Sequence, residues 1–125
     1  FRVLERMQLP PKFINAIKSL YKNTRFMIEL EGYGSDWHTQ HTGIRQGCPL
    51  SPYLFLIVMT TLFHDVHSQL DEQLKQNRTL GAEFDEVTYA DDTICISTCT
   101  KTLNKFVALI EKEGTRYGMK LNKNK

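Results

Sequence analysis

Two adjacent carboxylates, Asp91 and Asp92, interrupt a stretch of strand-forming residues that reads EFDEVTYADDTICIST. The flanking runs, residues 84–89 and 93–98, are rich in β-branched residues, so the pattern predicts a hairpin with both acids near its tip. Like charges held side by side repel each other unless a cation neutralises them. The other interpretation is a plain polar turn, which is what most Asp-Asp pairs form.

Magnesium is a cation that such a pair could bind. Mg²⁺ prefers carboxylate oxygens in octahedral geometry and keeps positions for water and substrate phosphate. Two such ions about 3.5–4 Å apart can activate an attacking hydroxyl and stabilise a leaving phosphate oxygen. Residues 51–100 carry eight acidic and two basic side chains, whereas residues 101–125 carry seven basic and two acidic ones. This distribution suits a metal site beside a phosphate-attracting surface, although charges that only solvate helix faces give the same counts.

A second candidate site is the stretch GIRQGCPLSP, residues 43–52, where two glycines and two prolines within ten residues exclude a regular element. Gly47 lets the backbone approach a ligand closely, and Arg45 offers a planar cation for phosphate. Gln46 offers both a donor and an acceptor, which suits a sugar hydroxyl or a base edge. The alternative is an ordinary loop that leads into a helix beginning at Ser51 and Pro52.

Three helices are expected from apolar residues that recur at helical spacing: residues 11–22, residues 51 to about 77, and residues 102–117. In the last helix the lysines and glutamates are assigned to the polar face. Gly118 is expected to end it.

The strands complete the predicted architecture. Residues 25–31 and 36–42 are expected to form a hairpin around a turn at residues 32–35, and residues 119–122 can begin another strand. The order of elements predicts an α+β fold in which two or three helices pack on an antiparallel sheet that contains the YADD hairpin.

Length and composition restrict the class of protein. The chain has 125 residues, of which 41% are hydrophobic and 24% charged, as in a single globular domain. No apolar run is long enough for a membrane span, and the start lacks a signal-peptide pattern. The three cysteines have no paired spacing, so we expect an intracellular protein, nuclear or cytoplasmic, and not a secreted one. Because the chain begins on Phe1 and ends on Lys125 within a basic run, we expect a fragment of a larger protein.

Several other residues could do chemistry. His64 and His67 lie three apart on a predicted helix and could bind zinc, but with no third ligand in view they are better interpreted as polar residues where the helix leaves the core. Cys48 has no histidine arranged to activate it, so it is expected to pack as a small apolar residue. Trp37 could stack on a base, but a packing anchor for its hairpin is favoured.

Together, GIRQGCPLSPYLF and, about forty residues later, YADDT resemble the palm of a reverse transcriptase of the non-LTR retrotransposon type. The first stretch is similar to the family's motif B, and residues 89–92 are similar to its motif C. Residues 101–125 resemble motif D, with a helix, a glycine and then MKLNKNK. The resemblance covers essentially the whole chain, and the form of motif B favours the retrotransposon branch over group II intron enzymes.

The resemblance implies a role for each matching residue. Asp91 and Asp92 would ligate two catalytic Mg²⁺ ions, and Tyr89 and Ala90 would lie near the primer terminus. Arg45, Gln46 and Gly47 would border the incoming nucleotide and the template, and Lys125 would lie near the triphosphate. The partners implied are an RNA template, a DNA primer and deoxynucleoside triphosphates, and the reaction is attack of the primer 3′-OH on the nucleotide α-phosphate.

The family's third metal ligand is an aspartate of motif A, which is expected to precede Phe1. Residues 1–125 would therefore be a partial palm that lacks motif A, the fingers and the thumb. We expect this chain to be inactive alone, although the parent protein would polymerise. A decayed or domesticated remnant without catalytic activity is the main alternative, and an RNA-templated RNA polymerase is a further one. The oligomeric state is not indicated by the sequence.

Overall fold

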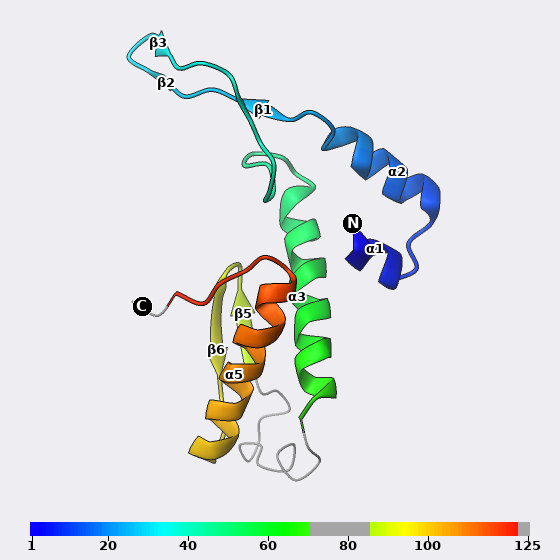
Figure 1. Cartoon of the computed structure of the whole chain (residues 1–125), viewed down its shortest axis with the longest axis vertical. Coiled ribbons are helices and arrows are strands. Elements are labelled where there is room, and N and C mark those ends of the chain that lie inside the picture. Colours follow the sequence, from blue (N-terminus) through cyan, green and yellow to red (C-terminus); the bar gives the residue numbers. More distant parts are fainter. Residues whose placement is uncertain (71–85, 123–125) are drawn as a thin grey trace. The chain divides into compact units, whose positions relative to one another are not determined.

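The computed structural model describes residues 1–70 and 86–122. The chain divides into two compact units, Phe1–Ser51 and Pro52–Lys125, which are drawn together in Figure 1 and described separately below. Both units mix helices with short antiparallel strands, which confirms the predicted α+β class. Among the described residues the strands form three two-stranded ladders: β1 with β4, β2 with β3, and β5 with β6.

The first unit begins with two helices that contact each other, α1 (Arg2–Arg6) and α2 (Pro11–Leu20). The sequence did not lead us to expect α1, because its five residues are too few to show a helical period. Pro11 stands at the first position of α2, where its missing N–H costs no hydrogen bond. The buried residues of the pair are apolar: Val3, Leu4, Ile14 and Ile17.

A hairpin follows, made of β1 (Arg25–Phe26), β2 (Glu29–Leu30), β3 (Tyr33–Gly34) and β4 (His38–Thr39). The hairpin is confirmed, but its predicted turn at residues 32–35 is wrong. Glu31 and Gly32 form the turn with φ angles of 50° and 82°, and Leu30 pairs with Tyr33. Positive φ at both central residues is what the tight turns matching strand twist require.

The same hairpin contains a bulge between its two ladders. Phe26 pairs with His38, and the backbone of Ile28 is bonded to Ser35, so Met27 faces two residues of the returning strand. An extra residue on one strand bends a hairpin and strengthens its twist.

The second unit contains α3 (Ser51–Ser68), the hairpin of β5 (Glu86–Tyr89) and β6 (Asp92–Cys95), and α5 (Thr100–Arg116). Figure 1 shows the hairpin and α5 running beside α3. Their shared core contains Met59, Leu62, Phe63, Val66 and Leu70 from α3 and the residues after it, with Phe106 from α5. Cys95 of the hairpin packs against this core.

The helix α3 starts at Ser51 as predicted but ends at Ser68. A continuous helix to about Asn77 is therefore wrong, and residues 71–77 lie outside the described part of the chain. The Ser68 hydroxyl and the Gln69 amide both donate to the Asp65 carbonyl, at 2.8 and 3.0 Å. These side chains satisfy a carbonyl that a longer helix would have bonded through its backbone.

The helix α5 ends as the sequence predicts, at a glycine. Gly118 has φ +73°, its N–H donates to the Thr115 carbonyl at 3.1 Å, and the Met119 N–H donates to the Gly114 carbonyl at 2.9 Å. These two bonds form a Schellman motif, which requires a left-handed residue at Gly118. Residues 119–122, called the exit segment below, form no strand, so that prediction is wrong.

Two glycines, Gly114 in the last turn of α5 and Gly118 just after its C-cap, should respond differently to substitution. Gly118→Ala should lower the free energy of unfolding by about 1 kcal/mol, because a Cβ is unfavourable in the left-handed region. Gly114→Ala should be neutral or stabilising by up to about 1 kcal/mol, because its Cβ would meet its nearest neighbours only at 3.7–3.9 Å. Urea unfolding of both variants measures the difference, and equal destabilisation would contradict this account.

Candidate active site

The two carboxylates lie where the second hairpin turns. Tyr89 pairs with Asp92, so Ala90 and Asp91 form the turn and Asp92 is the first residue of β6. Ala90 has a φ of 51°, which a residue with a side chain adopts only at a cost. All four of these residues are exposed. The predicted position of the acids at the hairpin tip is thus found.

The two faces of the hairpin differ. Val87 and Ile94 pair on one face and are 46% and 65% exposed. Thr88 and Thr93 pair on the other face, where their hydroxyl oxygens are 3.5 Å apart, and Cys95 on that face reaches the core. Because only one face of the hairpin packs on the core, the pairing register of β5 and β6 is fixed. A slip by one residue would move every side chain of the slipped strand to the opposite face.

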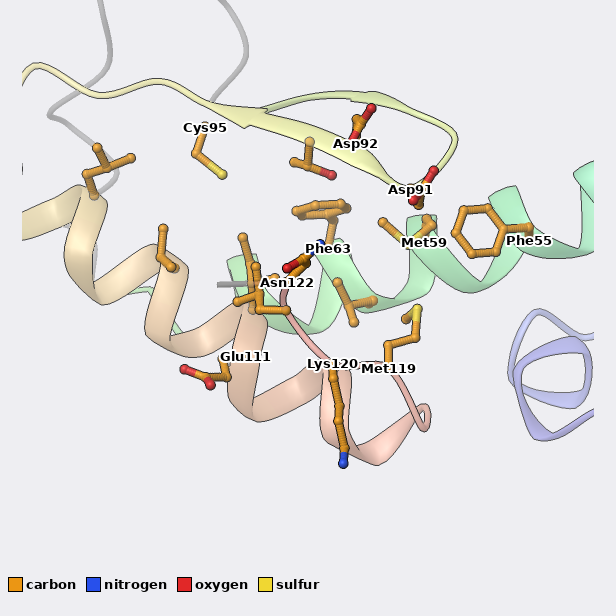
Figure 2. A pocket seen from close by; sticks show the side chains of 17 residues that line it. Phe55, Met59, Phe63, Asp91, Asp92, Cys95, Glu111, Met119, Lys120 and Asn122 are labelled. Atoms are coloured by element: carbon orange, nitrogen blue, oxygen red, sulfur yellow. The ribbon is translucent and has the colours of Figure 1, made fainter. Parts of the chain in front are cut away.

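A pocket of about 670 Å³ lies beside the hairpin tip. Figure 2 shows Asp91 and Asp92 on the hairpin and Phe55, Met59 and Phe63 projecting from α3. The other walls come from α5 and from the exit segment. The pocket therefore brings the acids of the predicted motif C next to residues of the predicted motif D.

The exit segment contributes both polar and apolar groups to this pocket. Its residues Met119, Lys120, Leu121 and Asn122 all line the pocket. The side chain of Lys120 extends away from the hairpin (Figure 2), whereas Met119 packs against the core. Lys125, predicted to lie near a triphosphate, is outside the described residues.

The donor atoms at the hairpin tip are of the kind that magnesium prefers. Asp91 and Asp92 supply the hard carboxylate oxygens that Mg²⁺ prefers, and both are exposed beside the pocket. Within residues 1–70 and 86–122, no group of three or more His, Cys, Asp or Glu is placed to hold a metal ion. The pair fits as part of a metal site, and a complete site needs at least one more ligand.

The loop of the predicted motif B, residues 43–50, belongs to the first unit, whereas the helical residues that follow Ser51 belong to the second. Residues 43–50 form no helix or strand, as expected, and Gly43 and Gly47 have positive φ angles of 84° and 79°. Gln46 and Gly47 are exposed. The Arg45 guanidinium donates to the carbonyl of Leu20 at 3.2 Å, at the end of α2, so this predicted phosphate ligand also supports the loop.

The sequence of the chain matches a known protein family. The family model described as "Reverse transcriptase (RNA-dependent DNA polymerase)" matches residues 1–125. The chain belongs to the reverse transcriptase family.

Two curated relatives are polyproteins of retrotransposable elements. One is the retrovirus-related Pol polyprotein from type-1 retrotransposable element R2 of Nasonia vitripennis, 28% identical over 94% of this chain and 11% of the relative. The other is the retrovirus-related Pol polyprotein from type-2 retrotransposable element R2DM of Drosophila melanogaster, 25% identical over 93% of this chain and 10% of the relative. The chain spans about a tenth of the length of these relatives. The predicted resemblance to retrotransposon reverse transcriptases is confirmed.

Sequence reasoning missed one polar cluster in this reverse transcriptase segment. Glu113 was assigned to the polar face of its helix, but it is buried, with 2% of its surface exposed. Its carboxylate accepts hydrogen bonds from Gln69 at 2.9 Å and from Arg116 at 2.7 Å. These bonds and the charge of Arg116 hold its pKa below the ordinary value. Its position could have been found from helical spacing. Glu113 lies three residues after Ile110 and four before Tyr117, so it shares their apolar face of the helix.

Of the other side chains considered for chemistry, His67 has a structural partner, whereas His64 and Trp37 are exposed. His67 lies 2.9 Å from a carboxylate oxygen of Glu86, a contact across to β5, and His64 is exposed. Trp37 is 64% exposed, so its interpretation as a packing anchor is wrong.

Among the described residues, no helix combines the length and apolar character needed to cross a bilayer.

The three free cysteines of this reverse transcriptase segment should differ in reactivity. A hydrogen bond from the Leu50 backbone lowers the pKa of Cys48, and one from the Thr102 backbone lowers the pKa of Cys99. Burial, with the nearby charge of Glu86, raises the pKa of Cys95. Because the thiolate is the nucleophile, Cys48 and Cys99 should be alkylated several-fold faster than Cys95 near neutral pH.

Iodoacetamide labelling followed by peptide mass spectrometry measures these rates. The differences should disappear in denaturant, where all three thiols have ordinary surroundings. Faster labelling of Cys95 in the folded protein would contradict the assignment.

Proposed function

We propose that the protein containing this chain is an RNA-directed DNA polymerase of a non-LTR retroelement, which adds deoxynucleotides to a primer 3′-OH on an RNA template. The observation that carries the proposal is the family match over residues 1–125, joined to the position of Asp91 and Asp92 at the tip of a paired hairpin. The names of the two curated relatives, both Pol polyproteins from retrotransposable elements, support it.

Asp91 and Asp92 are proposed to hold Mg²⁺ with their carboxylate oxygens. When bound, the ions would lower the barrier by neutralising charge on the attacking and leaving oxygens. The protein's own contribution is to fix the two acids at a short turn whose strands are in register. Tyr89, which is 84% exposed beside them, is free of core packing and suited to contact the primer terminus.

Nucleotide and template contacts are assigned to the first unit. Gln46 and Gly47 are exposed in the loop. Gly47 has a positive φ angle, a conformation that residues with a side chain rarely adopt, and its lack of a Cβ lets a ligand approach the backbone closely. Arg45 can offer its remaining donors to phosphate while one of them supports Leu20. Lys125 is proposed to approach the triphosphate. These partners place the protein inside the cell, in the nucleus or cytoplasm.

A third carboxylate is proposed to come from a strand outside these 125 residues. Among the described residues β6 pairs only with β5, so its other edge can bond a further strand. The pocket extends from β6 to the exit segment and has apolar side chains of α3 and α5 along it. A strand with apolar residues on its inward face would fill this space and could bring an aspartate to Asp91 and Asp92.

The activity test uses the longer protein, a DNA primer annealed to an RNA template, deoxynucleoside triphosphates and Mg²⁺. Asp91→Asn and Asp92→Asn should each lower incorporation by more than about a hundredfold. Loss of a residue that only hydrogen-bonds a metal ligand already lowers metal affinity or activity 10–100-fold, and loss of a ligand itself should cost more. Asp36→Asn, the same chemical change at an exposed acid in the first unit, is the matched control and should retain activity.

Three outcomes would contradict the proposal or part of it. An inactive wild-type protein would favour the non-catalytic remnant. Preference for ribonucleotides over deoxynucleotides would favour an RNA polymerase. Incorporation by the 125-residue chain alone would show that it needs no third carboxylate from outside.

A further inference from the structure

The last turns of α3 and α5 are joined by a polar cluster, the helix clamp, which consists of Asp65, Gln69, Glu113 and Tyr117. The Tyr117 hydroxyl donates to an Asp65 carboxylate oxygen at 2.7 Å. The Gln69 amide donates to both the Asp65 carbonyl and the Glu113 carboxylate, at 3.0 and 2.9 Å. Asp65 and Glu113 are buried, with 9% and 2% of their surfaces exposed.

Buried polar groups bonded to one another hold two elements in a single relative arrangement. Apolar packing between α3 and α5 tolerates small sliding, because dispersion contacts have little directionality. A hydroxyl bonded to a buried carboxylate tolerates little sliding, since losing the bond leaves an acceptor unsatisfied in a poorly solvated place. The helix clamp thus determines where α5 ends on α3.

Tyr117 is the clamp residue nearest to the exit segment. It is the C-cap of α5 and directly precedes Gly118, whose Schellman motif turns the chain through the Met119 to Gly114 bond. The next four residues line the pocket that Asp91 and Asp92 also line. An anchored Tyr117 therefore sets the starting point and direction of the pocket wall that faces the two acids.

We infer that Tyr117, through its bond to Asp65, is a positioning residue that places the exit segment relative to the Asp91–Asp92 site. The inference rests on the proposed function, because the pocket between β6 and the exit segment is the space proposed for the strand that carries the third carboxylate. Tyr117 touches no substrate in this account. It acts through residues 119–122, which form the pocket wall against which that strand would pack, and it so sets how the third carboxylate would meet the Mg²⁺ that holds the triphosphate.

The test removes one oxygen atom. Tyr117→Phe keeps the ring in the core and removes the hydroxyl that bonds Asp65. In the longer protein, with an RNA template and DNA primer, this variant should raise the KM for deoxynucleotide about fivefold, which is within the range that one hydrogen bond is worth. Its Kd for primer–template should stay within about twofold of the wild-type value, because the acids and the loop of the first unit are unchanged.

A matched control separates positioning from loss of stability. Leu109→Ala removes packing from the same helix and core, but Leu109 lies outside the pocket lining and the clamp. It should lower the melting temperature at least as much as Tyr117→Phe and leave the nucleotide KM unchanged. A raised KM in Leu109→Ala, or an unchanged KM in Tyr117→Phe, would overturn the inference.

Hydrogen exchange gives a readout that does not depend on catalysis. Tyr117→Phe should speed exchange of the Gly118 and Met119 amides about fivefold, and peptides from the middle of α5 should keep their protection. Unchanged exchange at both amides would overturn the positioning role. If the wild-type protein incorporates nothing, the proposed function fails, and this measurement alone decides whether Tyr117 holds the exit segment.

Discussion

The position of Asp91 and Asp92 depends on the packing of one hairpin face against the α3–α5 core. A two-stranded hairpin is marginal in water by itself, and the ladder of β5 and β6 has only four residue pairs. Cys95 reaches the core from this ladder, while Val87 and Ile94 remain exposed on the other face. The burial of one face selects the register, and the register places Asp91 in the turn and Asp92 at the start of β6.

The second unit builds the rest of the candidate site around that hairpin. The helix α3 supplies the apolar floor of the pocket, and α5 delivers the exit segment to the wall facing the acids. The end of α5 is determined twice, by the left-handed Gly118 and by the bond from Tyr117 to Asp65. A chemical site made of exposed side chains is in this way positioned by buried ones.

Local signals in the sequence were sufficient for the elements that carry the candidate site. Strand-forming residues on either side of Ala90 predicted the hairpin, Ser51 and Pro52 predicted the start of α3, and Gly118 predicted the end of α5. The tight turn at Glu31 and the end of α3 at Ser68 were not predicted. Each depends on a specific interaction, a positive φ in one case and side-chain bonds to the Asp65 carbonyl in the other, which periodicity does not reveal.

The buried polar cluster was missed for a related reason. Glu113 was treated as a surface residue because isolated carboxylates rarely lie in a core. Its burial is possible only because Gln69, which lies forty-four positions away in the chain, and Arg116 bond it. Pairing over that separation follows from the fold and not from any local pattern. The pocket beside Asp91 and Asp92 likewise joins segments that spacing in the sequence does not bring together.

The central claim is that the tip of the second hairpin holds the catalytic metal ions of a polymerase. Anomalous diffraction from Mn²⁺ tests it most directly, in crystals of the longer protein bound to primer–template and a non-hydrolysable deoxynucleotide. The account predicts a metal peak about 2.1 Å from a carboxylate oxygen of Asp91, with a third carboxylate from outside these 125 residues. A fully ligated metal pair elsewhere, with Asp91 and Asp92 bound only to water, would contradict it.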